Sequence, residues 1–510
     1  MNGTQSFITS FTRFPIDFWN SLFRHGLPSS DRTRSETIFQ NLFLHIHPIK
    51  VHRWSLKSTF TLGLGVMATA SFIILTLTGI LLMLYYKPST ALAYDSIKDI
   101  HFVVPTGRFI RNMHRWSAHI MVVTVLAHMA RVFFTAAYKG SRKFNWVIGL
   151  ILLVLTLALS FTGYLLPWDQ VAYWAITICA NIAQSPREIT DAFNLTQYFD
   201  PGGLIKTVLL GSTGIGEDAL IRFNMLHCVV LPLILGGFLG IHFWRIRKDG
   251  GLARPDDADI ELGPPPEDER PIFTQAPQKT YGLMAFVPGT SPRVGRSPEN
   301  TVASWPNLYY AELAVLMLTV VVTLALSVWL DAPLKELANP LVPENPAKAP
   351  WYFLGLQELV SHSAFMGGIG IPTIVMLGLF LIPYIDHEKT VEGRWFGSLL
   401  EKSVALQSAI FGLSSVILLE TFAIKIGWLR DLFPAINPLI IVVCNPGTVL
   451  TFIYMLWSIC IFKKTNSIRM GAVSLFICFL CGFLVLTIIA VQFRGPNWDF
   501  YWWPSLWPNH

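Results

Sequence analysis

Four histidines lie in two apolar stretches of the chain, two in each stretch. His114 and His128 are 14 residues apart, and His227 and His242 are 15 apart. In an α-helix, at about 100° and 1.5 Å per residue, each pair returns to within about 40–60° of one direction and is separated by about 21–23 Å. Each helix would therefore present two imidazoles on one face, at two depths.

Two such helices that cross in the same direction would bring these imidazoles together in pairs. His114 would face His227 at one depth. His128 would face His242 at the other, which predicts two bis-histidine sites. Two neutral imidazoles are the usual axial ligands of a haem iron that carries electrons without binding oxygen. A hydrogen-bonded packing role is the alternative for any single intramembrane histidine, but the matched spacing of all four favours haem.

Glycines repeat this spacing in two other apolar stretches. Gly65 and Gly79 are 14 residues apart, as are Gly149 and Gly163. A residue without a side chain would let a flat macrocycle approach the helix backbone at each depth. The alternative is that these glycines only allow helices to pack closely, as is common in membranes.

Four arginines lie near the ends of the histidine-bearing stretches. They are Arg111, Arg115, Arg131 and Arg247. Each could pair with a haem propionate through charge-assisted hydrogen bonds, or could simply extend its charge to the membrane surface.

The composition indicates the elements that carry these residues. Hydrophobic residues make up 52% of the chain and charged residues only 14%, against about a quarter in soluble proteins. Nine stretches are long enough to cross about 30 Å of hydrocarbon, so we expect an all-α, polytopic membrane protein. The stretches are 60–85, 116–137, 145–166, 222–244, 309–330, 367–385, 404–424, 447–463 and 470–491.

Lysine and arginine gather in the connections 138–144, 245–308, 386–403 and 464–469, all of which face the cytoplasm if the chain begins there. This distribution indicates membrane topology and not a nucleic-acid partner. We expect five regions along the chain. They are a cytoplasmic segment at 1–57 with a candidate amphipathic helix at 14–23, a four-helix dihaem bundle at 58–248, a cytoplasmic linker at 249–308, a second helical module at 309–403, and additional transmembrane helices with an aromatic tail at 404–510.

Several segments resemble cytochrome b of the Rieske/cytochrome b complexes, especially its cytochrome b6-like form. They are FIRNMHRWSAH with LAHMARVF, SFTGYLLPWDQVAYWA, and RFNMLHCVVLPL with IHFWRIRK, within about residues 50–250. ANPLVPENPAKAPWYFLGLQEL resembles the quinol-site half of cytochrome b, the subunit IV of photosynthetic complexes, which is fused here.

The resemblance implies the cytochrome b subunit of a quinol:cytochrome c oxidoreductase with two non-covalent b haems. His114 and His227 would bind the haem near the positive side, and His128 and His242 the haem near the cytoplasm. Quinol would be oxidised at the positive side, with one electron passing through both haems to a second quinone site, coupled to proton translocation. The implied partners are a Rieske iron–sulfur protein, a c-type cytochrome, quinone, lipid and a second copy of the chain, in a bacterial inner membrane.

Two departures from the family pattern matter. The family's Pro-Glu-Trp-Tyr motif reads Ala-Pro-Trp-Tyr at 349–352, which retains Trp351 and Tyr352 but lacks the carboxylate. Because quinol oxidation needs a base within hydrogen-bond reach, we expect Glu358 to replace it; an interfacial surface glutamate is the alternative. Cytochrome b6 binds a further haem covalently through a cysteine, and Gly63 stands at that position, so no covalent haem is expected.

Two other functions stay open from the sequence. One is a non-bifurcating dihaem membrane anchor that links quinone to a dehydrogenase or reductase. The other is a haem-free transporter in which intramembrane histidines relay protons. The second helical module disfavours the anchor, and the matched glycines disfavour the transporter.

Overall fold

The computed structural model describes residues 15–16, 28, 31–41, 44–263, 300–388, 392–433 and 435–508. The chain forms two compact units, residues 1–59 with 256–314 and residues 60–255 with 315–510. The second unit contains both expected helical modules, which therefore pack into one body. The region boundaries drawn from the sequence stay predictions, and the candidate helix at 14–23 lies almost wholly outside the described residues.

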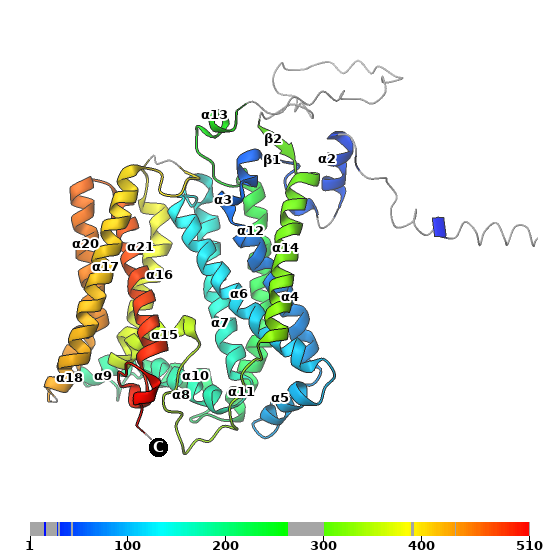
Figure 1. Ribbon diagram of the computed structural model, residues 1–510. Coiled ribbons are helices and arrows are strands. Elements are labelled where there is room, and N and C mark those ends of the chain that lie inside the picture. Colours follow the sequence, from blue (N-terminus) through cyan, green and yellow to red (C-terminus); the bar gives the residue numbers. More distant parts are fainter. Residues whose placement is uncertain are drawn as a thin grey trace, which may run out of the picture. The chain divides into compact units, whose positions relative to one another are not determined.

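The predicted helical class and its nine spans are confirmed within the described ranges, where nine helical segments are long and apolar enough to cross a membrane. Figure 1 shows α4, α6, α7 and α12 side by side, with α16, α17, α20 and α21 as a neighbouring group. The spans are α4 (Leu64–Met83), α6 (Gly107–Phe134), α7 (Lys143–Leu165), α11 with α12 (Glu217–Met225 and Leu231–Lys248), α14 (Ser304–Trp329), α16 (Ile371–Ile385), α17 (Leu399–Ile426), α20 (Pro446–Thr465) and α21 (Ile468–Ile488).

Shorter elements connect the spans. The helices are α2 (Asp31–Gln40), α3 (Ser58–Thr61), α5 (Ala93–Phe102), α8 (Gln170–Gln184), α9 (Arg187–Ala192), α10 (Pro201–Leu210), α13 (Ala258–Leu262), α15 (Trp351–His362), α18 (Leu429–Leu432) and α19 (Pro438–Val443). In the smaller unit, strands β1 (Lys50–His52) and β2 (Thr301–Ala303) pair antiparallel, with Val51 opposite Val302.

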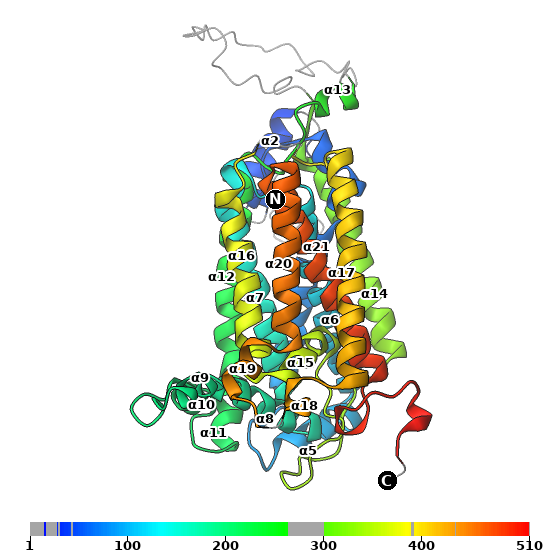
Figure 2. The ribbon, with the colours of Figure 1, turned by 90° about the vertical axis from the view of Figure 1, so that its left-hand side faces the viewer.

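The larger unit has two distinct ends. Helices α5, α8, α10 and α15 gather at one of them, together with the C-terminal segment; we name it the α15 end (Figure 2). The connections α6–α7, α16–α17 and α20–α21 lie at the opposite end (Figure 1). These are the lysine- and arginine-rich connections that the sequence predicts on one side of the membrane.

Two spans contain a π turn directly before a proline. Leu226–Val230 comes before Pro232, and Met366–Gly370 comes before Pro372. Proline lacks an N–H, and its ring clashes with the carbonyl four residues earlier, so the backbone widens locally to bonds between residues five apart. The first π turn thus inserts one additional residue into the span formed by α11 and α12.

A buried polar network joins the additional C-terminal helices to the first half of the chain. Arg469 of α21 is 1% exposed, and its Nη2 lies 2.7 Å from Oε1 of Glu401 in α17. Its Nη1 donates to Tyr138 Oη at 3.1 Å. Tyr138 in turn donates to Asp386 at 2.6 Å, and Lys139 pairs with the same carboxylate at 2.8 Å. Because unpaired charges are costly to bury, this network fixes the docking of α17 and α21.

Candidate functional site

The four predicted histidines form two pairs between α6 and the α11–α12 span. The ring centroids of His114 and His227 are 6.1 Å apart, with 74° between the ring planes. Those of His128 and His242 are 6.5 Å apart, with 79° between the planes. A metal–imidazole bond of about 2 Å on each side, plus about 1 Å from each nitrogen to its ring centre, predicts about 6 Å for two axial ligands. Both pairs therefore have the separation that one haem iron requires.

The π turn at Leu226–Val230 explains why spacings of 14 and 15 residues give matching pairs. In a regular helix, 15 residues would end about 60° beyond four full turns, as the sequence analysis assumed. The wide turn absorbs one residue. Apart from this one residue, the segment from His227 to His242 turns through the same angle as the segment from His114 to His128 in α6. The angle about the helix axis between His227 and His242 therefore equals that between His114 and His128, which corrects the larger offset expected from the sequence.

One pair is held in a defined tautomer by hydrogen bonds. His227 Nδ1 lies 3.1 Å from the carbonyl oxygen of Leu159, which can only accept. Thr78 Oγ1 donates to Ile74 O at 2.7 Å and lies 2.9 Å from Nδ1 of His114, from which it accepts. Both Nδ1 atoms therefore carry the proton, and both Nε2 atoms keep the lone pair that a metal needs.

A repeated Thr-Gly dipeptide marks this pair, and only its glycines are predicted from the sequence to take part in the site. Thr78 precedes Gly79, and Thr162, which precedes Gly163, lies with Oγ1 3.3 Å from His227 Nδ1. At the other depth, no threonine precedes the glycines. There, Nδ1 of His128 is buried without a hydrogen-bond partner among the described residues.

Each predicted glycine faces one histidine at its own depth. The pairs are Gly79 with His114, Gly163 with His227, Gly65 with His128 and Gly149 with His242. A Cβ added at Gly163 would lie only 2.5 Å from Cε1 of His227, whereas one at Gly149 would lie 3.8 Å from Cε1 of His242. The glycines thus make room for the imidazole rings, and close approach of a macrocycle stays a prediction.

The predicted arginines differ in their surroundings. Arg111 is buried and donates to the carbonyl oxygens of Ala332 at 2.8 Å and Pro333 at 2.6 Å. Arg131 is also buried and donates to Phe60 O at 3.2 Å. The other two, Arg115 and Arg247, are partly exposed. Pairing of the four with haem propionates remains a prediction.

A cavity of about 360 Å³ lies between α7, α8 and the segment 347–360. Its walls are mostly apolar and include Phe161, Pro350 and Phe353. Gln357 adds a polar group, and Lys348 is the only charged side chain among the described residues that line it. A flat, apolar molecule with a few hydrogen-bonding oxygens is the kind of ligand that such a cavity accommodates.

The PWDQ turn at 167–170 fastens the second half of the chain beside this cavity. Asp169 accepts from the backbone N–H of Lys335 at 3.0 Å. Gln170 accepts from the N–H of Asn339 at 2.7 Å and donates to the carbonyl of Val342 at 2.5 Å. Burial raises the pKa of the Asp169 carboxyl, whereas its backbone hydrogen bonds lower it. The motif therefore positions the loop that leads to α15.

Trp351 and Tyr352 point from α15 toward the histidine-bearing bundle. Trp351 Nε1 donates to Nδ1 of His119 at 3.1 Å, and the Tyr352 hydroxyl is hydrogen-bonded to Ser160. His119 lies between His114 and His128 on α6, and the sequence gives no sign of its contact with Trp351. Neither Trp351 nor Tyr352 is among the cavity-lining residues.

Glu358 lies on a different face of α15 from the cavity-lining residues. Its side chain is fully buried, so the alternative of an interfacial surface glutamate is wrong. Arg494 Nε lies 3.0 Å from Oε1, and Trp498 Nε1 donates to Oε2 at 3.0 Å. The expected base is thus ion-paired outside the cavity, while Gln357 and Lys348, which the sequence analysis did not select, line it.

The comparisons with known proteins agree with this geometry. The sequence model of the family described as cytochrome b/b6/petB matches residues 53–250. Cytochrome b6 of Heliobacterium modesticaldum is 40% identical over 204 residues, which is 40% of this chain and 88% of that protein. Cytochrome b6 of Gracilaria tenuistipitata is 38% identical over 187 residues, 37% of this chain and 81% of that protein. A chain of a hyperthermophilic respiratory complex III shares the fold, with a TM-score of 0.54 and 22% identity over 85% of this chain and 91% of that one.

Proposed function

This chain belongs to the cytochrome b/b6 family, and on that premise we propose that it is the cytochrome b subunit of a quinol:cytochrome c oxidoreductase. Membership of the family implies haem binding in a multi-pass membrane protein. The proposal adds two non-covalent b haems, quinol oxidation at the α15 end, and proton translocation across a bacterial inner membrane. The proposed partners are a Rieske iron–sulfur protein, a c-type cytochrome, quinone, lipid and a second copy of the chain.

The observation that carries the proposal is the pair of imidazole–imidazole separations, 6.1 and 6.5 Å. When bound, haem would supply one-electron redox chemistry at each depth. His114 and His227 would hold one haem, with their Nδ1 protons anchored. His128 and His242 would hold the other, and the Arg111, Arg115, Arg131 and Arg247 cations would balance the propionates.

The cavity between α7, α8 and segment 347–360 supports quinol as the substrate. Its apolar walls would exclude water from a bound ring, and Lys348 supplies a cation at the wall that a ring oxygen could contact. Trp351 and Tyr352 link α15 to α6 and α7 through His119 and Ser160. We propose that they keep the cavity wall in place beside the His114–His227 pair, and that Glu358 acts on proton transfer from behind that wall.

The absence of covalent haem is also part of the proposal. Gly63 has a φ of +64°, which favours glycine. A Cβ at this position would lie 2.9 Å from both methyl carbons of Val315. A cysteine here would therefore meet both backbone strain and a steric clash.

A pyridine haemochrome assay with dithionite-reduced minus oxidised spectra tests the haem assignment on the purified chain. We expect two non-covalent b haems per polypeptide. His114→Leu and His128→Leu should each remove one of them, because each variant leaves one pair intact. A chain without haem would instead support the transporter.

Quinol-driven reduction of the haems distinguishes the proposed complex from a dihaem anchor. The complex with its Rieske partner is measured with an inhibitor bound at the second quinone site, so that haem is reduced only from the quinol-oxidising site. We expect fast haem reduction when the iron–sulfur centre is oxidised and slow reduction when it is reduced. Equal rates with reduced and oxidised iron–sulfur protein would favour the non-bifurcating anchor.

A further inference from the structure

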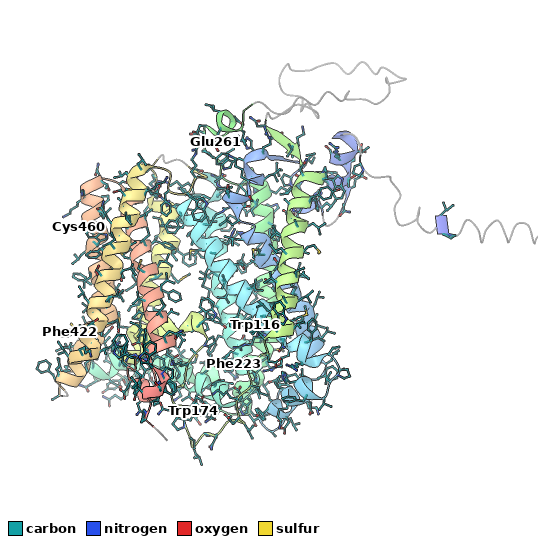
Figure 3. All side chains as sticks on the ribbon, in the orientation of Figure 1. Trp116, Trp174, Phe223, Glu261, Phe422 and Cys460 are labelled. Carbon is teal, nitrogen blue, oxygen red and sulfur yellow. The ribbon has the colours of Figure 1, made fainter. Side chains whose placement is uncertain are left out.

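A buried polar cluster lies behind α15, away from the cavity side of this helix. Glu358, His362 and Glu420 each place one nitrogen or oxygen atom within 4.8 Å of the others. Glu420 belongs to α17, one of the additional helices, and was not selected from the sequence. Figure 3 labels Phe422 on α17 and Trp174 on α8, both at the α15 end, whereas Cys460 of α20 lies toward the opposite end.

The two carboxylates of this cluster differ in their partners. The Glu358 carboxylate is balanced by Arg494 and accepts from Trp498. Glu420 is only 3% exposed, and its Oε2 has no hydrogen-bond partner among the described residues. A second carboxylate so close to the first would be a buried negative charge without its own cation. A proton on Glu420 removes this cost.

Lys348 links the cavity to the segment that leads to Arg494. It lines the cavity, and its Nζ donates at 2.9 Å to the carbonyl of Val491, three residues before Arg494. Burial lowers the pKa of the Lys348 ammonium, while the negative charge of Glu358 raises it. The charged groups that face Glu420 are Glu358 and His362 of α15 and Arg494 after α21.

We propose that Glu420 and His362 store and release a proton taken from quinol, in place of the carboxylate that the Ala-Pro-Trp-Tyr motif lacks. The inference rests on the proposed function. Quinol loses two electrons and two protons as it becomes quinone, and the electrons leave to the haem and to the iron–sulfur partner. Glu420, which rests protonated, releases its proton through His362 to the α15 side, and one quinol proton passes by Lys348 and Glu358 to Glu420 Oε2 and restores the carboxylic acid there. The other quinol proton leaves to water at the α15 end.

Glu420→Gln in the assembled complex tests this proposal, because the amide keeps the shape of the side chain but cannot take up the proton. We expect quinol-driven haem reduction to fall by at least about tenfold, as for loss of a general base, with unchanged dithionite-reduced spectra. Glu312→Gln is the matched control: it makes the same change on another span, where Glu312 pairs with His47. A full rate in Glu420→Gln would overturn the proposal.

Infrared difference spectra between two pH values give a second readout that does not need quinol. We expect the unsubstituted complex to show a protonated carboxyl band that Glu420→Gln lacks. If the band is present but quinol never reduces the haems, the proposed function fails while proton storage stands. If quinol reduces the haems but no band belongs to Glu420, the storage proposal fails. Should Glu420→Gln not assemble, His362→Gln takes its place: slowed reduction supports the proposal, and an unchanged rate and pH profile overturn it.

Discussion

Nε of Arg494 lies 3.0 Å from Oε1 of Glu358, a residue 136 positions earlier in the chain. The contact fastens α15, which carries the Trp-Tyr motif, to the turn after the last span. The helices beyond the part that resembles cytochrome b thus support, from behind, the wall of the cavity between α7, α8 and segment 347–360. This gives the C-terminal region a structural role that the sequence alone did not indicate.

Arg494→Gln should therefore destabilise the protein. It leaves the Glu358 carboxylate buried without a cation, which costs about 3–5 kcal/mol, and thermal loss of the haem absorbance would measure it. Arg187→Gln breaks a solvent-screened pair with Asp200 and should destabilise the protein much less. Equal effects of the two substitutions would contradict this assignment.

Thr78→Val should change the haem of the first pair only. It removes the acceptor of the His114 Nδ1 proton, which weakens the ligand, so we expect about 10- to 100-fold lower haem affinity and a higher midpoint potential. A redox titration followed in the haem absorption bands measures both haems at once. Thr124→Val is the control, because the Thr124 hydroxyl binds only carbonyls of its own helix. A shift in the midpoint potential of the second haem instead would show that Thr78 was assigned to the wrong histidine pair.

Alanine substitutions of the glycines should have graded effects. Gly163→Ala places a Cβ 2.5 Å from His227, whereas in Gly149→Ala it lies 3.8 Å from His242. We expect the first variant to lose one haem and the second to keep both in the haemochrome assay. Gly236→Ala in α12, where a Cβ would meet no atom within 4 Å, should also keep both. Two haems in Gly163→Ala would show that α7 can move away from the ring.

Lys348→Met should remove one limb of the pH profile of quinol oxidation. Burial lowers the pKa of Lys348, so its ammonium loses its proton below the ordinary lysine value of about 10.4. If the neutral amine accepts the quinol proton, the rate rises as the pH rises through that pKa. We expect Lys348→Met to be slow throughout and to lack this rise. Lys335→Met, which only breaks a pair with Glu344 at 3.1 Å, should retain it.

The sequence predicted what depends on periodicity and failed where distant segments meet. Apolar length predicted the nine spans, and the similar spacings of 14 and 15 residues predicted both histidine pairs. The spacing of the histidines did not predict the π turn before Pro232, because this turn depends on the backbone hydrogen bond that the proline removes. The partners of Glu358 and Trp351, Arg494 and His119, are separated from them by 136 and 232 residues. Only the packed helices bring these side chains together.

The buried network around Arg469 has a consequence for the synthesis of the chain. Arg469 contacts Tyr138, a residue made 331 positions earlier, so the network cannot close until the last span has left the ribosome. In a nascent chain arrested before that point, Glu401 and Tyr138 would lack their cationic partner. Tyr138 also lines the cavity that contains His128 and His242. Emergence of α21 and closure of the wall around the second histidine pair are therefore linked, and protease accessibility of chains arrested before and after α21 would time it.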